Sequence, residues 1–427
     1  MKTGTTYLQH LMGDNKGDLL RAGYLFPGDE WVEQSLATRD ILGRGRKVSD
    51  PELATLTEGM WDRLSREMLS HKGRASIFSM EFLSFAGRQQ AARIVQRSLS
   101  SAVVHVVLTV RDAVGAIPAQ WQTRCRNQGT LSWPEFVHQA TLVGTLGRAA
   151  PGEGAQVYRR AQDIPRMLDV WGRVVPAKRI HVVTCPPSSA DSLLLWRRFA
   201  QAVGVDPAVA SEPPDYANPS IGQASADLMR RINAMLGDLP ALDHRKTLKR
   251  HLATILGERA GLESRPRLDL ATLQFAADWN RRVREAVVDS GAQLIGDLEE
   301  LPTRVSTEAA AAAAATLSDP SEDELLAAAA TAREGMSDLV RIRMKLREKR
   351  GGGEDDNVDV PLDSATQATD RNGQQDAVSA AVTEVAALCR RAIDLRRQLD
   401  KLRVPLSAEP RMGTHAGVGA DHDTDPR

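Results

Sequence analysis

The feature that most constrains the fold is a nearly continuous apolar run over residues 103–110, which is followed at once by Arg111 and Asp112. Such a run is typical of a parallel β-strand that is covered on both faces. Shorter runs of the same kind occupy residues 75–84, 179–185 and 292–298, with helical patterns between them over residues 113–128, 136–146, 193–203 and 274–288. The alternation predicts an α/β fold with a doubly wound parallel sheet flanked by helices.

The start of the chain has the composition of an anion site: Lys2, Thr3, Gly4, Thr5 and Thr6. Apolar residues at helical spacing follow, so this segment stands at a helix start, where free N–H groups and the helix dipole favour an anion. Gly4 lets the backbone approach the anion, while Lys2 adds a full positive charge. The Walker A pattern is absent. An ordinary capped helix with a chance lysine is the competing interpretation.

Two further charged residues stand at or near the ends of predicted strands, where a ligand could also bind. Glu81 lies near the end of the run over residues 75–84, and Arg111 directly follows the run over residues 103–110. In open α/β sheets, ligands bind beyond the carboxyl ends of the strands. We therefore expect Glu81 and Arg111 to converge on the segment around Lys2.

These motifs, taken in order, resemble those of a known enzyme family. The segment from Lys2 to Thr6, residues 79–84 and residues 107–112 are similar to the motif series of sulfotransferases that use 3′-phosphoadenosine-5′-phosphosulfate (PAPS). Residues 119–122 and 296–299 are similar to segments of a bacterial branch of that family. The resemblance covers residues 1–302. It implies a sulfotransferase-type, P-loop-like fold and transfer of a sulfuryl group from PAPS, without a metal, to a hydroxyl or amine.

The resemblance also implies a role for each motif. Lys2, Thr3, Gly4, Thr5 and Thr6 would bind the 5′-phosphosulfate, with Lys2 at the bridging oxygen where charge develops. Arg111 would bind the 3′-phosphate. Glu81 would be the general base; a salt-bridge partner for Lys2 or Arg111 is the alternative interpretation. The acceptor would be a small molecule, a glycan or a lipid.

Some positions depart from the family or carry no chemistry. The family commonly places a serine eight residues after the arginine, where this chain has Ala119, and Arg124 or Arg126 could supply the missing donor. His105 and His181 lie within apolar runs, which favours core histidines with hydrogen-bond partners over catalytic ones.

The phosphate loop of this family follows a central first strand, yet only Met1 precedes Lys2. The expectation is that upstream codons encode about ten to fifteen more residues, mostly an apolar strand. Without it, the chain is expected to be poorly soluble and inactive, because inner strand edges would be exposed. The competing function is a non-catalytic nucleotide-binding relative that acts through its C-terminal helices. A nucleotide kinase is a weaker third option.

Overall composition restricts the partners. The formal net charge is zero, so no global field favours nucleic acid. The three cysteines show neither metal spacing nor a paired framework, which favours a reducing, cytoplasmic compartment. No apolar run reaches the length of a membrane span. Residues 213–267 are rich in turns and arginines and predict helices over a sheet edge.

The chain after Pro302 changes character. We expect the α/β domain to occupy residues 1–302, followed by a helical extension (303–350), a polar linker (351–375), an amphipathic helix (376–403) and a disordered tail (404–427). Ser321 and Glu324 have the spacing of a capping box. Apolar residues step by three or four through 376–403. This pattern predicts either a coiled coil with a second copy or another helix, or docking of the same face on the core.

Overall fold

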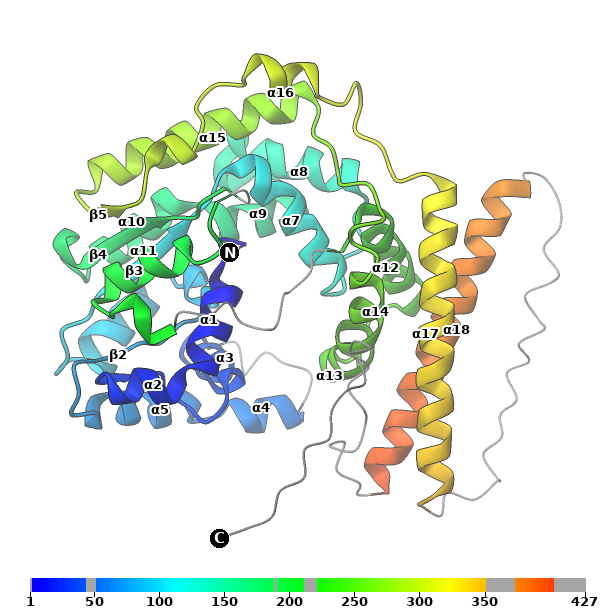
Figure 1. The fold of residues 1–427 in the computed structure, drawn as a ribbon, viewed down its shortest axis with the longest axis horizontal. Helices are drawn as coiled ribbons and strands as arrows, with labels where there is room; N and C mark the ends of the chain where they lie inside the picture. Colours follow the sequence, from blue (N-terminus) through cyan, green and yellow to red (C-terminus); the bar gives the residue numbers. More distant parts are fainter. Residues whose placement is uncertain (1, 44–50, 188–189, 211–220, 351–372, 403–427) are drawn as a thin grey trace, which may run out of the picture.

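The computed structural model describes residues 2–43, 51–187, 190–210, 221–350 and 373–402. Helices predominate, and two small parallel sheets lie among the helices of the N-terminal three quarters of the chain (Figure 1). The protein therefore has α/β character with a helical C-terminal part. The predicted tail (404–427) and most of the predicted linker (351–375) lie outside the described residues.

The larger sheet has the order β3-β4-β5, with strands Val106–Val110, Ile180–Thr184 and Gln293–Ile295. All its pairs are parallel, with Val106 opposite Ile180 and His181 opposite Gln293. The smaller sheet pairs β1 (Tyr24–Leu25) with β2 (Ala75–Ser76), also in parallel. The strands predicted over 103–110, 179–185 and 292–298 are thus present, although the first begins only at Val106.

The central strand of the larger sheet is buried on both faces, as its apolar sequence requires, whereas β3 is half-buried and β5 is mostly exposed. Side chains alternate along β4, so Val182 belongs to a core cluster with α7 and α15, while Val183 belongs to a second cluster with α1 and α11. All five residues of β4 are buried. The alternation places helices on the two sides of one sheet.

The helices fall into groups along the chain. The N-terminal group contains α1 (Thr5–Asp14), α2 (Lys16–Arg21), α3 (Trp31–Ile41), α4 (Pro51–Thr57) and α5 (Met60–Ser70). The second group contains η2 (Glu81–Phe85), α6 (Arg88–Ala92), η3 (Arg93–Ser98), α7 (Ala113–Cys125), α8 (Trp133–Leu146), η4 (Gly147–Ala149), α9 (Glu153–Gln162), α10 (Ile164–Gly172) and η5 (Ala177–Arg179). The third contains α11 (Leu194–Val203), η6 (Pro207–Ala210), α12 (Gln223–Leu236), α13 (Ala241–His244), the π-helix η7 (Arg245–Leu252), α14 (Ala253–Gly257), α15 (Leu270–Asp289), η8 (Leu298–Glu300) and α16 (Thr307–Ala311).

The strand predicted over residues 75–84 is wrong beyond its first part, because β2 is limited to Ala75–Ser76. The backbone groups that would continue the ladder are taken by side chains. The amide of Ser79 donates to Gln34 Oε1 at 2.8 Å, and its carbonyl accepts from Gln9 Nε2 at 2.9 Å. Side chains of α1 and α3 therefore occupy the backbone groups through which the strand would continue.

The C-terminal part forms a helical hairpin of α17 (Glu322–Glu348) and α18 (Gly373–Lys401), which run side by side next to α12–α14 (Figure 1). As predicted, Ser321 caps α17, since its Oγ accepts from the Glu324 amide. The stepped apolar face of α18 is buried within this chain: Val378, Val382, Val385, Ala392, Leu395 and Leu399. Docking on the core is therefore the arrangement observed, and association with a second copy remains a prediction. The core continues across Pro302, because residues of α17 and α18 share the cluster that holds α7.

Polar contacts fix the hairpin to the preceding helices. The buried guanidinium of Arg343 donates to the Ala392 carbonyl at 2.7 Å and to Thr247 Oγ1 at 3.3 Å. Asp243 of α13 pairs with both Arg396 and Arg397 of α18. The C-terminal hairpin thus holds the segment α13–η7 in place.

The two sheets leave an open edge on each side of residue 3. Within the described residues, β2 pairs only with β1 and β3 only with β4. Thr3 Oγ1 lies 2.5 Å from Thr109 Oγ1, near the carboxyl end of β3. A strand entering Thr3 from the N-terminal side would therefore run along the open edge of β3.

Candidate functional site

The N-terminal loop is held in a specific conformation. Lys2 has φ of 63° and Gly4 has φ of 79°, so both residues adopt left-handed backbone. This is uncommon for a residue other than glycine and is concentrated at functional sites. At Gly4 a Cβ atom would lie 2.2 Å from Leu195 Cδ2, so only glycine fits. Helix α1 begins at Thr5 without a side-chain cap, which leaves its first N–H groups available to a ligand.

Arg111 lies next to this loop, as the sequence predicts. It directly follows β3, and its Nη1 donates to the carbonyl of Lys2 at 3.4 Å. Its guanidinium lies over Gly115 at the start of α7, where a Cβ atom would be 2.9 Å from Nη2. The bare backbone of Gly115 therefore provides the space that keeps Arg111 beside Lys2.

Glu81 also lies near Lys2, but it is carried by a different element from the one expected. It begins the short 3-10 helix η2 and does not end a strand. Its Oε2 accepts from Gln9 Nε2 at 3.2 Å, and Gln9 is buried in α1. The charge of Glu81 acts to raise the pKa of Lys2. In the described part of the chain no ion pair joins Glu81 to Lys2 or Arg111, and its carboxylate is hydrogen-bonded to Gln9.

Two further cations belong to the site although no motif marks them: Arg126 after α7, and Lys249 in η7. Both act on Lys2 electrostatically, and Arg126 also acts on Lys249. Lys249 is more than 240 positions from Lys2 in the sequence, so only the folding of η7 against the N-terminal part brings them together. The one available signal was the basic face of the segment 245–252, opposite Leu248 and Leu252.

The electrostatics of the cluster favour an anion. Burial, together with the charges of Arg126 and Arg111, lowers the pKa of Lys2 to about 8. Burial and the charge of Arg126 lower the pKa of Lys249 as well. In the described part of the chain, no carboxylate forms an ion pair with Lys2, Lys249 or Arg111. The same holds for the neighbouring Arg39 and Arg245. Cations gathered in this way repel one another, and a bound anion relieves that repulsion.

The position of the family serine, Ala119, lies on α7 and offers no hydroxyl. Of the two arginines proposed to compensate, Arg124 is engaged by Glu153. Arg126 is the one whose charge reaches Lys2.

His181 is a buried histidine with a hydrogen-bond partner, as expected, whereas His105 is exposed and differs from the expectation. Nδ1 of His105 lies 2.9 Å from Nε2 of His181, and the two rings are stacked with centroids 5.3 Å apart. His181 is buried but His105 is exposed, ahead of β3. Burial lowers the pKa of both rings. This pair lies at the amino ends of β3 and β4, opposite to the Lys2 loop.

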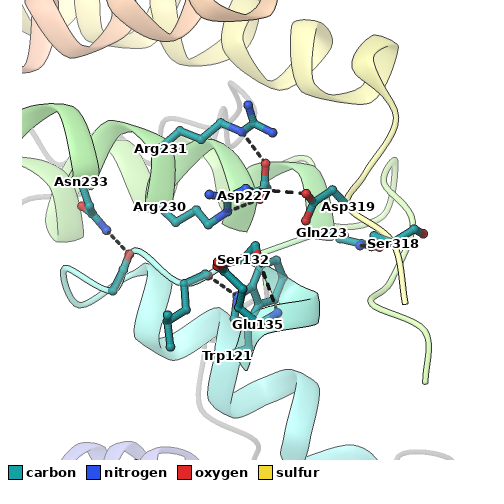
Figure 2. A network of polar contacts seen from close by, with 12 residues as sticks. Trp121, Ser132, Glu135, Gln223, Asp227, Arg230, Arg231, Asn233, Ser318 and Asp319 are labelled. Atoms are coloured by element: carbon teal, nitrogen blue, oxygen red, sulfur yellow. Dashed lines mark hydrogen bonds and ion pairs between the residues drawn. The ribbon is translucent and has the colours of Figure 1, made fainter. Parts of the chain in front are cut away.

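A second dense polar network lies around α12 and is shown in Figure 2. The buried Asp227 pairs with Arg230 and with Arg231, and Arg230 also lies 3.9 Å from Asp319. Gln223 Nε2 donates to the Ser318 carbonyl at 2.8 Å. Because these charges neutralise one another, the network is a structural connection between α12 and the segment before α17.

Other kinds of site find no support in the described residues. They contain no group of three or more His, Cys, Asp or Glu side chains arranged to hold a metal ion. A cavity of about 230 Å³ lies elsewhere, lined by Arg148, Arg159, Trp279 and Arg282 among others. None of the helices described is long and apolar enough to cross a membrane.

No protein-family model, no curated protein and no solved structure matches this chain. The function is therefore argued from the geometry of the cation cluster alone.

Proposed function

We propose that the chain binds a 3′-phosphoadenosine nucleotide at the Lys2 loop and transfers a sulfuryl group from PAPS to a hydroxyl or amine. The observation that carries this proposal is that Lys2 and Arg111 lie together at an uncapped helix start, joined through the Lys2 carbonyl, with Glu81 within electrostatic reach of Lys2. PAPS and its product are multiply charged anions with phosphate groups at two ends. Lys2 with the first N–H groups of α1 suits one end, and Arg111 suits the other.

The chemistry follows from these positions. The acceptor oxygen or nitrogen forms a bond to sulfur while the bond from sulfur to the bridging phosphate oxygen breaks. Glu81 takes the acceptor proton, and the electron pair of the broken bond stays on the phosphate oxygen. Lys2 faces the negative charge that develops there. Positioning and charge stabilisation supply most of the catalysis, as in phosphoryl transfer.

A non-catalytic nucleotide-binding protein is the second candidate. The left-handed backbone at Lys2 and the Gln9 contact to Glu81 fit binding as well as turnover. The two candidate functions share the nucleotide site and differ only in whether Glu81 acts as a base. Turnover measurements distinguish them.

Replacing Arg111 by alanine is expected to weaken the binding of 3′-phosphoadenosine-5′-phosphate by about 1.5–3 kcal/mol, the range for a hydrogen bond to a charged group. Isothermal titration calorimetry on the full chain measures the change. Arg281→Ala is the matched control, because Arg281 is an exposed arginine paired with Asp278 on α15. Equal affinity of Arg111→Ala and the unmodified chain would exclude Arg111 from the site.

Nucleotide affinity is expected to fall as the pH rises through about 8, the pKa of Lys2 in the free protein. Lys2 is charged below this pH, and a bound anion raises its pKa, so binding takes up a proton just above it. Loss of one charge-assisted contact lowers affinity by about tenfold. Lys2→Arg stays charged throughout, so its titration curve should be flatter. Identical pH profiles for the two proteins would show that Lys2 does not contact the anion.

A further inference from the structure

The cations of the site form two groups near Glu81. Lys2 and Arg111 are joined by the hydrogen bond to the Lys2 carbonyl and form the first group. The second group is Lys249, Arg245 and Arg39. The charge of Glu81 acts on both Lys2 and Lys249. The proposed base is therefore within electrostatic reach of both groups.

The second group is built by η7 and α3. Arg245 and Lys249 lie four residues apart in η7 on its solvent-accessible side, although surrounding protein still desolvates the Lys249 ammonium group. Thr247, Leu248 and Leu252 on the other side are buried. The two basic side chains therefore share one face of the helix. The buried side is fixed, since Thr247 Oγ1 accepts from Arg343 of α17.

Arg39 connects this face to the neighbourhood of Glu81. Its guanidinium carbon lies 6.0 Å from the centre of the Phe82 ring, and Phe82 is the residue next to Glu81 in η2. Arg245 and Arg39 act on each other and on Lys249 electrostatically. Among the described residues, no carboxylate forms an ion pair with any of these three cations.

We infer that Lys249, Arg245 and Arg39 bind an anionic group of the acceptor, so that the acceptor carries a carboxylate, phosphate or sulfate close to the hydroxyl or amine that receives the sulfuryl group. This inference rests on the proposed function. With the nucleotide on Lys2 and Arg111, the acceptor approaches Glu81 from the side of η7. A neutral acceptor would bring these three cations out of water without neutralising them, which costs free energy. An anionic acceptor forms charge-assisted hydrogen bonds there instead.

The test measures binding of two probes to the full chain saturated with 3′-phosphoadenosine-5′-phosphate, by calorimetry at fixed ionic strength. Hexagalacturonate is the anionic probe, and maltohexaose is a neutral sugar of equal length. We expect hexagalacturonate to bind at least about tenfold more tightly than maltohexaose. The double variant Arg39→Ala/Arg245→Ala, which leaves Lys249 in place, should lose this preference and keep its nucleotide affinity. Arg250→Ala is the matched control, because Arg250 is an exposed arginine of the same helix outside this group.

Three outcomes decide the inference. Equal binding of the two probes by the unmodified chain overturns it. A loss of nucleotide affinity in the double variant as large as that in Arg111→Ala also overturns it, because the cations would then belong to the nucleotide site, and the proposed function would survive. If hexagalacturonate binding depends on Arg39 and Arg245 while the nucleotide does not bind at all, the anion site stands and the nucleotide proposal fails.

Discussion

Glu81→Gln is expected to slow sulfuryl transfer by about 10²–10⁴-fold, the contribution of a positioned general base. The substitution keeps the shape of the side chain and an oxygen that can accept from Gln9 Nε2, so η2 and the Lys2 loop should keep their positions. It removes only the ability to take up the acceptor proton. Release of 3′-phosphoadenosine-5′-phosphate from PAPS, with a phenol, an amino sugar and hexagalacturonate as acceptors, measures the rate.

The nucleotide affinity of Glu81→Gln distinguishes the two interpretations of this residue. A base leaves the affinity nearly unchanged, whereas a structural partner of the cations changes it together with the melting temperature. Glu299→Gln is the control, since Glu299 is an exposed carboxylate paired with Arg284 far from the loop in sequence. A Glu81→Gln chain that transfers at the rate of the unmodified protein would contradict the assignment of the base.

Five apolar residues placed directly before Lys2 are expected to raise the melting temperature by several degrees. The edges of β2 and β3 carry backbone groups without ladder partners in the described part of the chain. A strand that enters Thr3 would pair along β3 and bury side chains between the two core clusters, and each buried Val or Ile contributes about 1.5–3 kcal/mol. The hydrogen bonds gained roughly offset the cost of ordering the added backbone. Differential scanning calorimetry measures the shift.

The control adds five glycine and serine residues at the same place, which cannot bury apolar surface. The apolar addition should also tighten nucleotide binding, because a strand that enters the loop fixes the start of α1. Equal melting temperatures for the two extended chains would show that the open edges do not accept a strand.

Much of the fold is visible in the sequence because burial on both faces demands continuous apolar strands. The strands β3, β4 and β5, the helix α7 after Arg111 and the capped start of α17 at Ser321 all follow from local patterns. The segment over residues 75–84 is the exception. Only Ile77 and Met80 of its apolar residues are buried. Side chains from Gln9 and Gln34 compete for its backbone groups, and no local pattern encodes that competition.

The candidate site shows the same division. The residue types and order around Lys2, Gly4 and Arg111 predicted an anion site, because helix starts and strand ends present donors in any α/β sheet. The sequence offered Arg126 only as a substitute for the missing serine. Lys249 escaped notice because it belongs to no motif, and a basic residue on a helix is usually a solvated one. Whether either residue lies near Lys2 depends on which surfaces meet.

The sequence alone determined the parallel strands, the helix that starts at Thr5, and a stepped apolar face on the last helix. Only the tertiary structure decided what that face covers, because the same spacing serves a coiled coil and a helix docked on its own core. The tertiary structure also decided the position of η7. The docked hairpin holds this helix through Asp243 and Arg343, so that the charge of Lys249 acts on Lys2. Contacts between residues so far apart in the chain arise when whole helices and strands pack together. Local composition therefore does not predict them.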